Sequence, residues 1–136
     1  MRLAVDPAVL AWALAPAGTT ARAALLEHGG FLPLAALEGL RAVRPRIAAE
    51  TGLARGEVWD LLEGLCRGLT AVPPEGYAEF LPLAGRLVAP PLAATLAVAL
   101  AMEVDALLAG GPGFEAQDLV PVFPAWPRPR QSALPR

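Results

Sequence analysis

The sequence predicts one α/β domain in which a mostly parallel sheet of about five strands lies between layers of helices. Short apolar runs alternate with helical segments along the 136 residues, and no two runs are joined by a tight hairpin turn. Hydrophobic residues make up 55% of the chain and charged residues 18%, so one sizeable core can form at this length. We therefore expect a three-layer α/β/α fold.

Proline and glycine define the elements of the first half. Pro7 holds the residue before it in an extended conformation, so the first strand should end at Asp6. Gly29 and Gly30 end a helix, and Pro45 breaks another. The expected elements are a strand over 2–5, a helix over 21–27, a strand over 31–32, and helices over 34–42, 46–51 and 54–65.

The second half continues the alternation. Pro82 lies early in an expected helix over 75–87 and should bend it or divide it in two. A helix over 92–103 is apolar on nearly every face, which is typical of a buried layer. The other expected elements are strands over 69–72, 104–108 and 119–123. We expect one domain over 1–123 and an extended or disordered proline-rich tail over 124–136.

Composition excludes several functional classes. All eleven basic residues are Arg and the net charge is -2, so a strongly cationic nucleic-acid surface is not expected. Cys66 is the only cysteine and His28 the only histidine, which favours a buried Cys66 over a catalytic thiol. The most apolar stretch, 87–102, is short and contains prolines, so we expect no membrane span and no leader segment. A cytoplasmic protein is the resulting expectation.

Two acidic residues are candidates for a metal site. In a parallel sheet, sites form beyond the carboxyl ends of the strands, where Asp6 is expected to lie. Glu38 lies one turn into the helix that follows the second strand. Carboxylates at such positions can bind Mg²⁺ or Mn²⁺, and two such ions can promote phosphodiester hydrolysis. Asp6 is equally well explained as a turn residue before Pro7, and Glu38 is more simply a solvent-facing side chain.

Several segments, in their order and spacing, resemble the PIN-like domain family, in particular the branch of toxins from toxin–antitoxin pairs. The segments that carry the resemblance are 2–10, with Asp6, 31–40, with Glu38, 44–47, 51–53, 57–58, 96–108, 113–114 and 120–123. The resemblance implies a homodimer, an antitoxin-like protein partner and a metal-dependent endoribonuclease. It also implies that the ends of the first and fourth strands lie side by side, with Asp6 near Gly111, and that Asp105 is structural.

The acidic cluster implied by the resemblance is incomplete in this chain. The family's Asp at the start of the late helix falls at about Leu92, and its Asp after the fourth strand falls at Gly111. Asp6 and Glu38 therefore remain as the metal-binding and catalytic candidates. Glu115 and Asp118 could substitute for the missing acids, but solvated loop charges are the simpler interpretation. Arg41, Arg44 and Arg46 could contact phosphates, although ordinary surface charges are again simpler.

Three hypotheses follow for the function. In the first, the protein is a degenerate PIN-like domain that acts through protein or RNA interaction, with little or no catalysis and no cofactor. In the second, it is an active Mg²⁺- or Mn²⁺-dependent ribonuclease that uses Asp6 and Glu38. In the third, it is an unrelated α/β binding module. The loss of two acidic positions favours the first, and the near-neutral charge argues against tight RNA binding.

Overall fold

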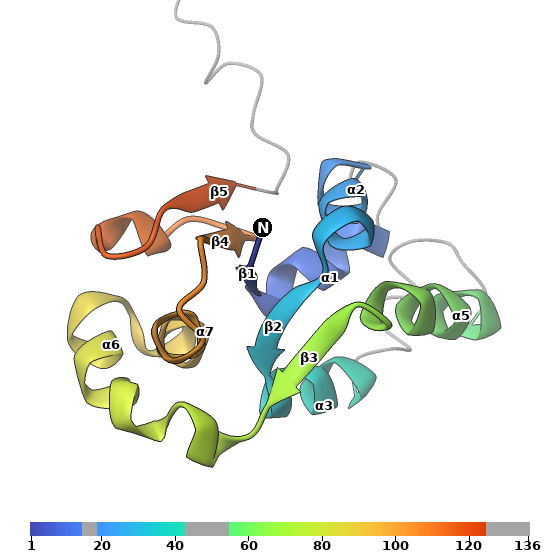
Figure 1. Ribbon diagram of the computed structural model, residues 1–136. Helices are drawn as coiled ribbons and strands as arrows, with labels where there is room; N and C mark the ends of the chain where they lie inside the picture. Colours follow the sequence, from blue (N-terminus) through green and yellow to red (C-terminus); the bar gives the residue numbers. More distant parts are fainter. Residues whose placement is uncertain (15–18, 43–54, 125–136) are drawn as a thin grey trace, which may run out of the picture.

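The computed structural model describes residues 1–14, 19–42 and 55–124, and its centre is a five-stranded sheet (Figure 1). Every neighbouring pair of strands is parallel, and the strand order is β3-β2-β1-β4-β5. The strands are β1 (Leu3–Val5), β2 (Gly30–Pro33), β3 (Leu69–Val72), β4 (Ala106–Ala109) and β5 (Val122–Pro124). The predicted three-layer α/β/α class is confirmed, and the sheet is parallel throughout.

Helices cover both faces of this sheet. One layer holds α1 (Pro7–Leu14), α2 (Thr19–His28), α3 (Leu34–Ala42) and α5 (Arg55–Cys66). The other holds α6 (Leu81–Leu87) and α7 (Pro90–Ala101), preceded by the 3₁₀ turns η1 (Pro74–Gly76) and η2 (Ala78–Phe80). A last 3₁₀ turn, η3 (Phe114–Ala116), lies between β4 and β5. Within the described ranges, no helix is long and apolar enough to cross a membrane.

Alternation along the central strands divides the core into two apolar clusters. Leu3 and Val5 of β1 pack with α1, α2 and α5 on one face, whereas Ala4 packs with α7 on the other. All three side chains are at most 1% exposed. Because both faces of β1 are covered, this strand is apolar throughout rather than alternately polar, as parallel strands usually are.

Helix α1 corrects the sequence analysis, which expected no helix before residue 19. Its residues are all apolar and show no polar face, so periodicity gave no sign of it. A second signal was present in the sequence. Pro7 suits the first position of a helix, and Asp6 before it is a favoured capping residue.

Prolines set the starts of the later helices. The helix expected over 75–87 is divided into η1, η2 and α6, with Pro82 in the first turn of α6. α7 begins at Pro90 rather than at residue 92, because the first turn of a helix tolerates residues without an N–H. Its central residues, 95–99, are buried, Pro90 and Pro91 at its start are exposed, and its last residues are half-exposed.

The remaining boundaries shift by a few residues. The fourth strand, expected over 104–108, is Ala106–Ala109, and the fifth, expected over 119–123, is Val122–Pro124. Gln117 explains the late start of β5, because its side chain bonds the carbonyls of Phe114 and Val120 and the amides of Leu119 and Val120. The helix expected over 46–51 and most of the expected tail lie outside the described residues.

Candidate functional site

The carboxyl ends of β1 and β4 form the centre of the candidate site. From β1 the chain builds the sheet outward through β2 and β3, and it then returns to place β4 and β5 on the other side of β1. In parallel α/β proteins, ligands usually bind at the carboxyl edge where such a reversal occurs. Asp6 follows β1 directly and Gly110 follows β4 directly, so both residues lie at this point.

The carboxylate of Asp6 is bound to the backbone that follows β1 and to the backbone that follows β4. Its Oδ2 accepts a hydrogen bond from the Gly110 amide at 2.9 Å, and its Oδ1 accepts one from the Ala8 amide at 3.3 Å. The residue is 7% exposed. The bond to Ala8 caps the first turn of α1, and the bond to Gly110 joins α1 to the end of β4. Asp6 therefore has a structural role that requires no metal ion.

Burial also changes the protonation of this carboxyl group. Burial raises the pKa of Asp6, and the hydrogen bonds from the Gly110 and Ala8 amides oppose that rise only in part. No described cation neutralises the carboxylate through an ion pair.

Gly110 allows the close approach on which this contact depends. A Cβ atom at this position would lie 2.6 Å from the Ala8 Cβ and 2.6 Å from the Val9 amide nitrogen. Such distances are far below van der Waals contact, so only glycine fits without movement of the backbone. At the next residue, Gly111, nothing lies within 4 Å of the position that a Cβ would occupy. A side chain at Gly111 would thus have room.

An apolar contact occupies another part of the same edge. Leu92, in the first turn of α7, lies against the loop that follows β4, where a Cβ on Gly113 would be 2.5 Å from the Leu92 Cδ1. Gly113 has a φ of 121°, a backbone conformation that favours glycine. Position 92 is where the family resemblance places a metal-binding Asp. Here it contributes hydrocarbon to the packing between α7 and the loop.

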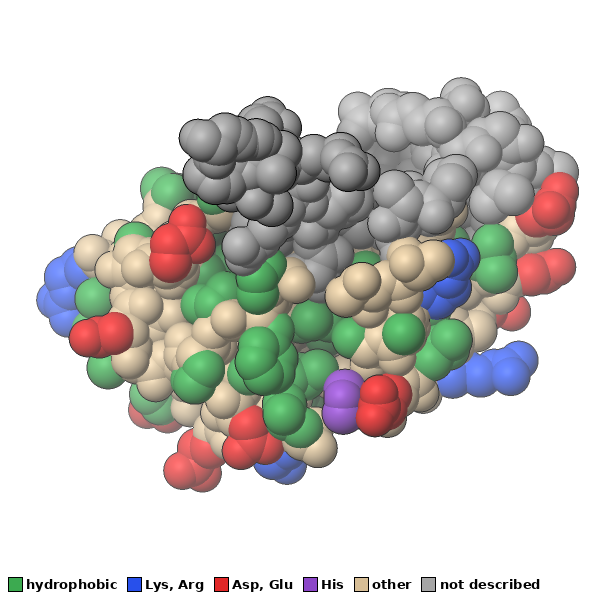
Figure 2. Space-filling view, turned by 90° about the horizontal axis from the view of Figure 1, so that it is seen from above, with side chains coloured by type: hydrophobic (Ala, Val, Ile, Leu, Met, Phe, Trp, Pro, Cys, Tyr) green, Lys and Arg blue, Asp and Glu red, His purple; other side chains and the backbone are tan. Residues whose placement is uncertain are grey.

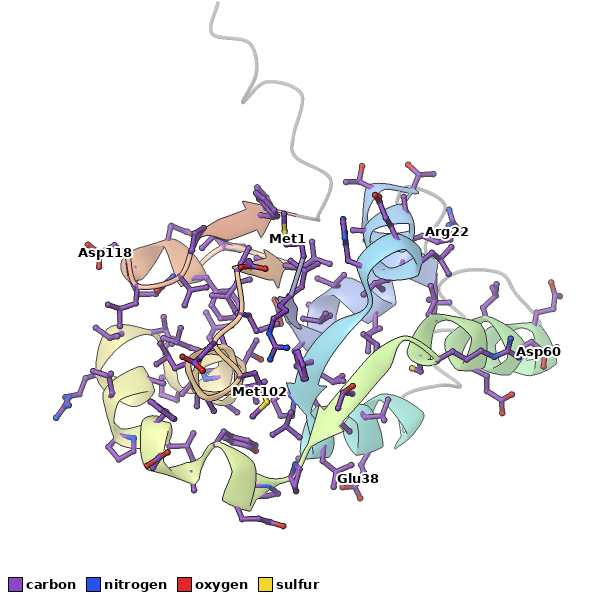
Figure 3. All side chains as sticks on the ribbon, viewed as in Figure 1. Met1, Arg22, Glu38, Asp60, Met102 and Asp118 are labelled. Atoms are coloured by element: carbon purple, nitrogen blue, oxygen red, sulfur yellow. The ribbon has the colours of Figure 1, made fainter. Side chains whose placement is uncertain are left out.

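Glu38 does not share the environment of Asp6. It is exposed on α3, and Figure 3 shows its side chain at the outer surface of that helix. Among the described side chains it has neither a hydrogen bond nor an ion pair. α3 does contact α1, the helix that Asp6 caps, so the two acids come from neighbouring elements. Their surroundings nevertheless differ, because one carboxylate is buried and bonded and the other is solvated.

Glu115 and Asp118, in the loop before β5, do not lie where they could replace the two missing acids of the implied metal site. Glu115 Oε1 accepts a hydrogen bond from the Gly113 amide at 2.9 Å, so its carboxylate is bound to its own loop. Asp118 is exposed, and Figure 3 shows it at the far side of the domain from Glu38. Within the part of the chain that is described, no three His, Cys, Asp or Glu side chains are grouped so as to hold a metal ion.

Asp105 and Arg2 connect the opposite, amino edge of the sheet. Asp105 Oδ2 accepts the Arg2 amide at 2.8 Å, and the Asp105 amide donates to the Arg2 carbonyl at 2.8 Å. The Arg2 guanidinium donates to the Met102 carbonyl at 2.7 Å and lies over the Phe31 ring, 4.9 Å from its centroid. These contacts hold the start of β1 against the end of α7.

The other residues considered from the sequence divide into two groups. Cys66, expected to be buried, is half-exposed at the end of α5, because the helix ends there. Arg44 and Arg46 lie outside the described residues, as does the side chain of Arg41.

The sequence analysis missed Gly110 and Gln117. Gly110 could have been found only by combining two features of the sequence. One is a glycine directly after a strand, and the other is a helix-capping residue directly after the strand that pairs with it.

The residues at this edge do not fit a two-metal site of the kind that the family resemblance implies. One carboxylate is bonded to two backbone amides, a second is solvated, and the other two positions are Leu92 and Gly111. Comparison with known proteins adds no further identification: no family model matches this chain, and no curated protein or solved structure matches it.

Proposed function

We propose that this chain is a degenerate PIN-like domain that acts by binding a protein, either a second copy of itself or an antitoxin-like partner, without metal-dependent catalysis. The observation that carries the proposal is the state of Asp6. Its carboxylate is buried, bonded to the Gly110 and Ala8 amides, and placed at the junction of β1 and β4. This acid holds the backbone together at the point where a nuclease of this kind would bind metal.

The strand order supports the family part of the proposal. A PIN-like arrangement requires the ends of the first and fourth strands to lie side by side, and β1 pairs with β4 through Val5 and Leu108. The Asp6 carboxylate accepts a hydrogen bond from the Gly110 amide, and Gly110 is the chain neighbour of Gly111, which supports the expected proximity of Asp6 and Gly111. The order is common to several parallel α/β folds, so it supports the assignment together with the sequence resemblance rather than alone.

The surface supports binding to protein rather than RNA. The net charge is -2 and the chain contains no lysine, whereas RNA-binding surfaces depend on clustered positive charge. Leu119 is 54% exposed and Phe123 is 46% exposed, and both lie on the β5 side of the sheet. Phenylalanine is among the aromatic residues that are enriched where proteins meet. We expect light scattering on the purified chain to give the mass of a dimer.

The catalytic part of the proposal is tested by calorimetric titration of Mn²⁺ into the wild type and into Asp6→Asn. We expect no binding to either protein at millimolar Mn²⁺ and no ribonuclease activity. Binding by the wild type that disappears in Asp6→Asn would instead establish a working metal pocket and support the ribonuclease hypothesis.

The family part is tested by restoring the two missing acids. Gly111 has room for a side chain and Leu92 is half-exposed, so the double variant Leu92→Asp, Gly111→Asp should fold. We expect it to gain Mn²⁺ binding, and we expect the added change Asp6→Asn to remove that gain. A folded double variant without metal binding would contradict the PIN-like assignment, while leaving the absence of catalysis in the wild type intact.

A further inference from the structure

A hollow at the amino edge of the sheet is separate from the site described above. It lies where α2 and α5 end, has a volume of about 300 Å³, and is lined by residues 25–29, Gly64, Leu65, Arg67 and Gly68. A second hollow of about 210 Å³ adjoins it and shares His28 and Gly68. The first volume is at the lower end of the range for small-molecule sites. Figure 2 shows this edge, with hydrophobic side chains beside the histidine.

The inner wall of the first hollow is apolar. Leu25 is 2% exposed and Leu65 is 4% exposed, so both belong to the core that lies beneath the hollow. Leu26 lies at the rim and is 65% exposed. Gly64 keeps the space open, because nothing lies within 4 Å of a Cβ placed there. Leu26 supplies most of the exposed apolar surface for a small ligand, and Leu25 and Leu65 form the base of the hollow.

The mouth of the hollow carries a cation that no described acid neutralises. Arg67 follows the last residue of α5, is exposed, and forms no ion pair with any described residue. His28 contributes a ring nitrogen 3.8 Å from Glu27 Oε2, and the Glu27 side chain is 74% exposed. The Glu27 side chain is thus turned to solvent, whereas the charge of Arg67 is available to a ligand.

Glycine backbone separates the two hollows and fixes their shape. A Cβ on Gly29 would overlap the Gly68 carbonyl oxygen, and Gly29 has a φ of 65°. The Gly30 amide donates to the Gly68 carbonyl at 3.2 Å, and the Gly29 amide donates to the Leu25 carbonyl at 2.9 Å. The Gly68 and Leu25 carbonyls at this mouth therefore each accept a backbone hydrogen bond.

We propose that this hollow binds a small amphipathic anion, an apolar molecule that carries one carboxylate. The apolar part lies against Leu25, Leu26 and Leu65, and the carboxylate lies at Arg67 with His28 beside it. Arginine suits this role because its guanidinium presents several donors to a carboxylate. The proposal does not depend on the function proposed above, since it concerns the opposite edge of the sheet.

The test is a titration of octanoate into the full chain, followed by the amide signals of Gly29, Gly64 and Gly68 in a nitrogen–proton NMR spectrum. We expect saturable shifts of these signals with octanoate, and weaker or no shifts with octanol and with inorganic phosphate. Arg67→Ala should weaken octanoate binding on the order of tenfold, the scale of one charge-assisted hydrogen bond. Arg86→Ala, on exposed helix surface of the other layer, should leave it unchanged.

A second variant tests the hollow without removing a charge. Gly64→Leu places a side chain in the open space and should abolish binding, while the better helix former keeps α5 folded. Gly85→Leu is the matched control, because Gly85 is also helical with nothing within 4 Å of its Cβ and lies on α6. Equal shifts with octanol and octanoate, or unchanged octanoate binding in folded Gly64→Leu, would overturn the proposal.

Discussion

The residues at the carboxyl edge and at the amino edge of the same sheet make different kinds of contact. At the carboxyl edge, the Asp6 carboxylate is bonded to two backbone amides and Leu92 is packed against the loop at Gly113. At the amino edge, two hollows remain open and Arg67 carries an unneutralised charge. Parallel α/β proteins usually place their sites at the carboxyl edge. In this molecule the described residues Asp6 and Leu92 make structural contacts at that edge, and the two hollows lined by described residues lie at the other edge.

The largest effect on this comparison is expected from Gly110→Ala. The new Cβ would meet the Ala8 Cβ and the Val9 amide nitrogen at 2.6 Å, so β4 and α1 must move apart. We expect a loss of about 3 kcal/mol in the free energy of unfolding, measured by urea denaturation. Gly111→Ala is the matched control and should change it by less than about 0.5 kcal/mol. Equal losses would mean that the close approach at Gly110 does not support the carboxyl edge.

A smaller loss is expected from Asp6→Ala. The variant leaves the Gly110 and Ala8 amides without their acceptor, and the first of these amides is buried. We expect a cost of about 1.5 kcal/mol at neutral pH by urea denaturation. Glu38→Ala removes an exposed carboxylate and should cost less than about 0.5 kcal/mol. If Glu38→Ala proved the more costly change, the structural role assigned to Asp6 would be wrong.

At the amino edge, Arg2→Ala tests whether the contacts there contribute as much to the free energy of unfolding as those at the carboxyl edge. The variant removes the hydrogen bond to the Met102 carbonyl and the guanidinium contact with the Phe31 ring. Because Arg2 is exposed, we expect a loss of only about 1 kcal/mol, again from denaturation. A loss of unfolding free energy larger than that of Gly110→Ala would mean that the amino edge contributes more to stability than the carboxyl edge.

The smallest effect is a dependence on pH. The folded-state pKa of Asp6 lies above its ordinary value of 3.8, so the folded protein binds this proton more tightly than the unfolded chain. The resulting stability is fully present below pH 3.8 and is lost as pH rises through the folded-state pKa. The unfolding free energy of the wild type, minus that of Asp6→Asn, should therefore fall between acidic and neutral pH. A difference that rises with pH would show that the ionised carboxylate is the favoured form.

The sequence was sufficient for the architecture, because the architecture depends on patterns that single segments display. The apolar runs at 2–5, 69–72 and 104–108 predicted strands close to those observed, and the absence of hairpin turns predicted parallel pairing. Helix α1 was missed because its segment displays no such pattern. Its uniformly apolar residues have no period that distinguishes a buried helix from other buried structure.

The candidate site was less predictable, since it depends on partners far apart in the chain. Asp6 was identified correctly as the residue at the end of the first strand, with a structural and a metal-binding interpretation left open. The choice between them depends on Gly110, which is 104 positions away and offers an amide rather than a side chain. A backbone donor has no signature in a sequence, and neither does the burial that raises the pKa of Asp6.

The composition of β5 limits how copies of this chain can associate. Pro121 precedes the strand and Pro124 ends it, and neither residue has an N–H to donate to a further strand. An added strand would find its hydrogen-bond ladder interrupted at both ends, so this border of the sheet resists edge-to-edge aggregation. A dimer formed on this side would therefore have to pack through side chains such as Phe123 and not extend the sheet. Such an interface separates on dilution, whereas strand addition can propagate into fibres.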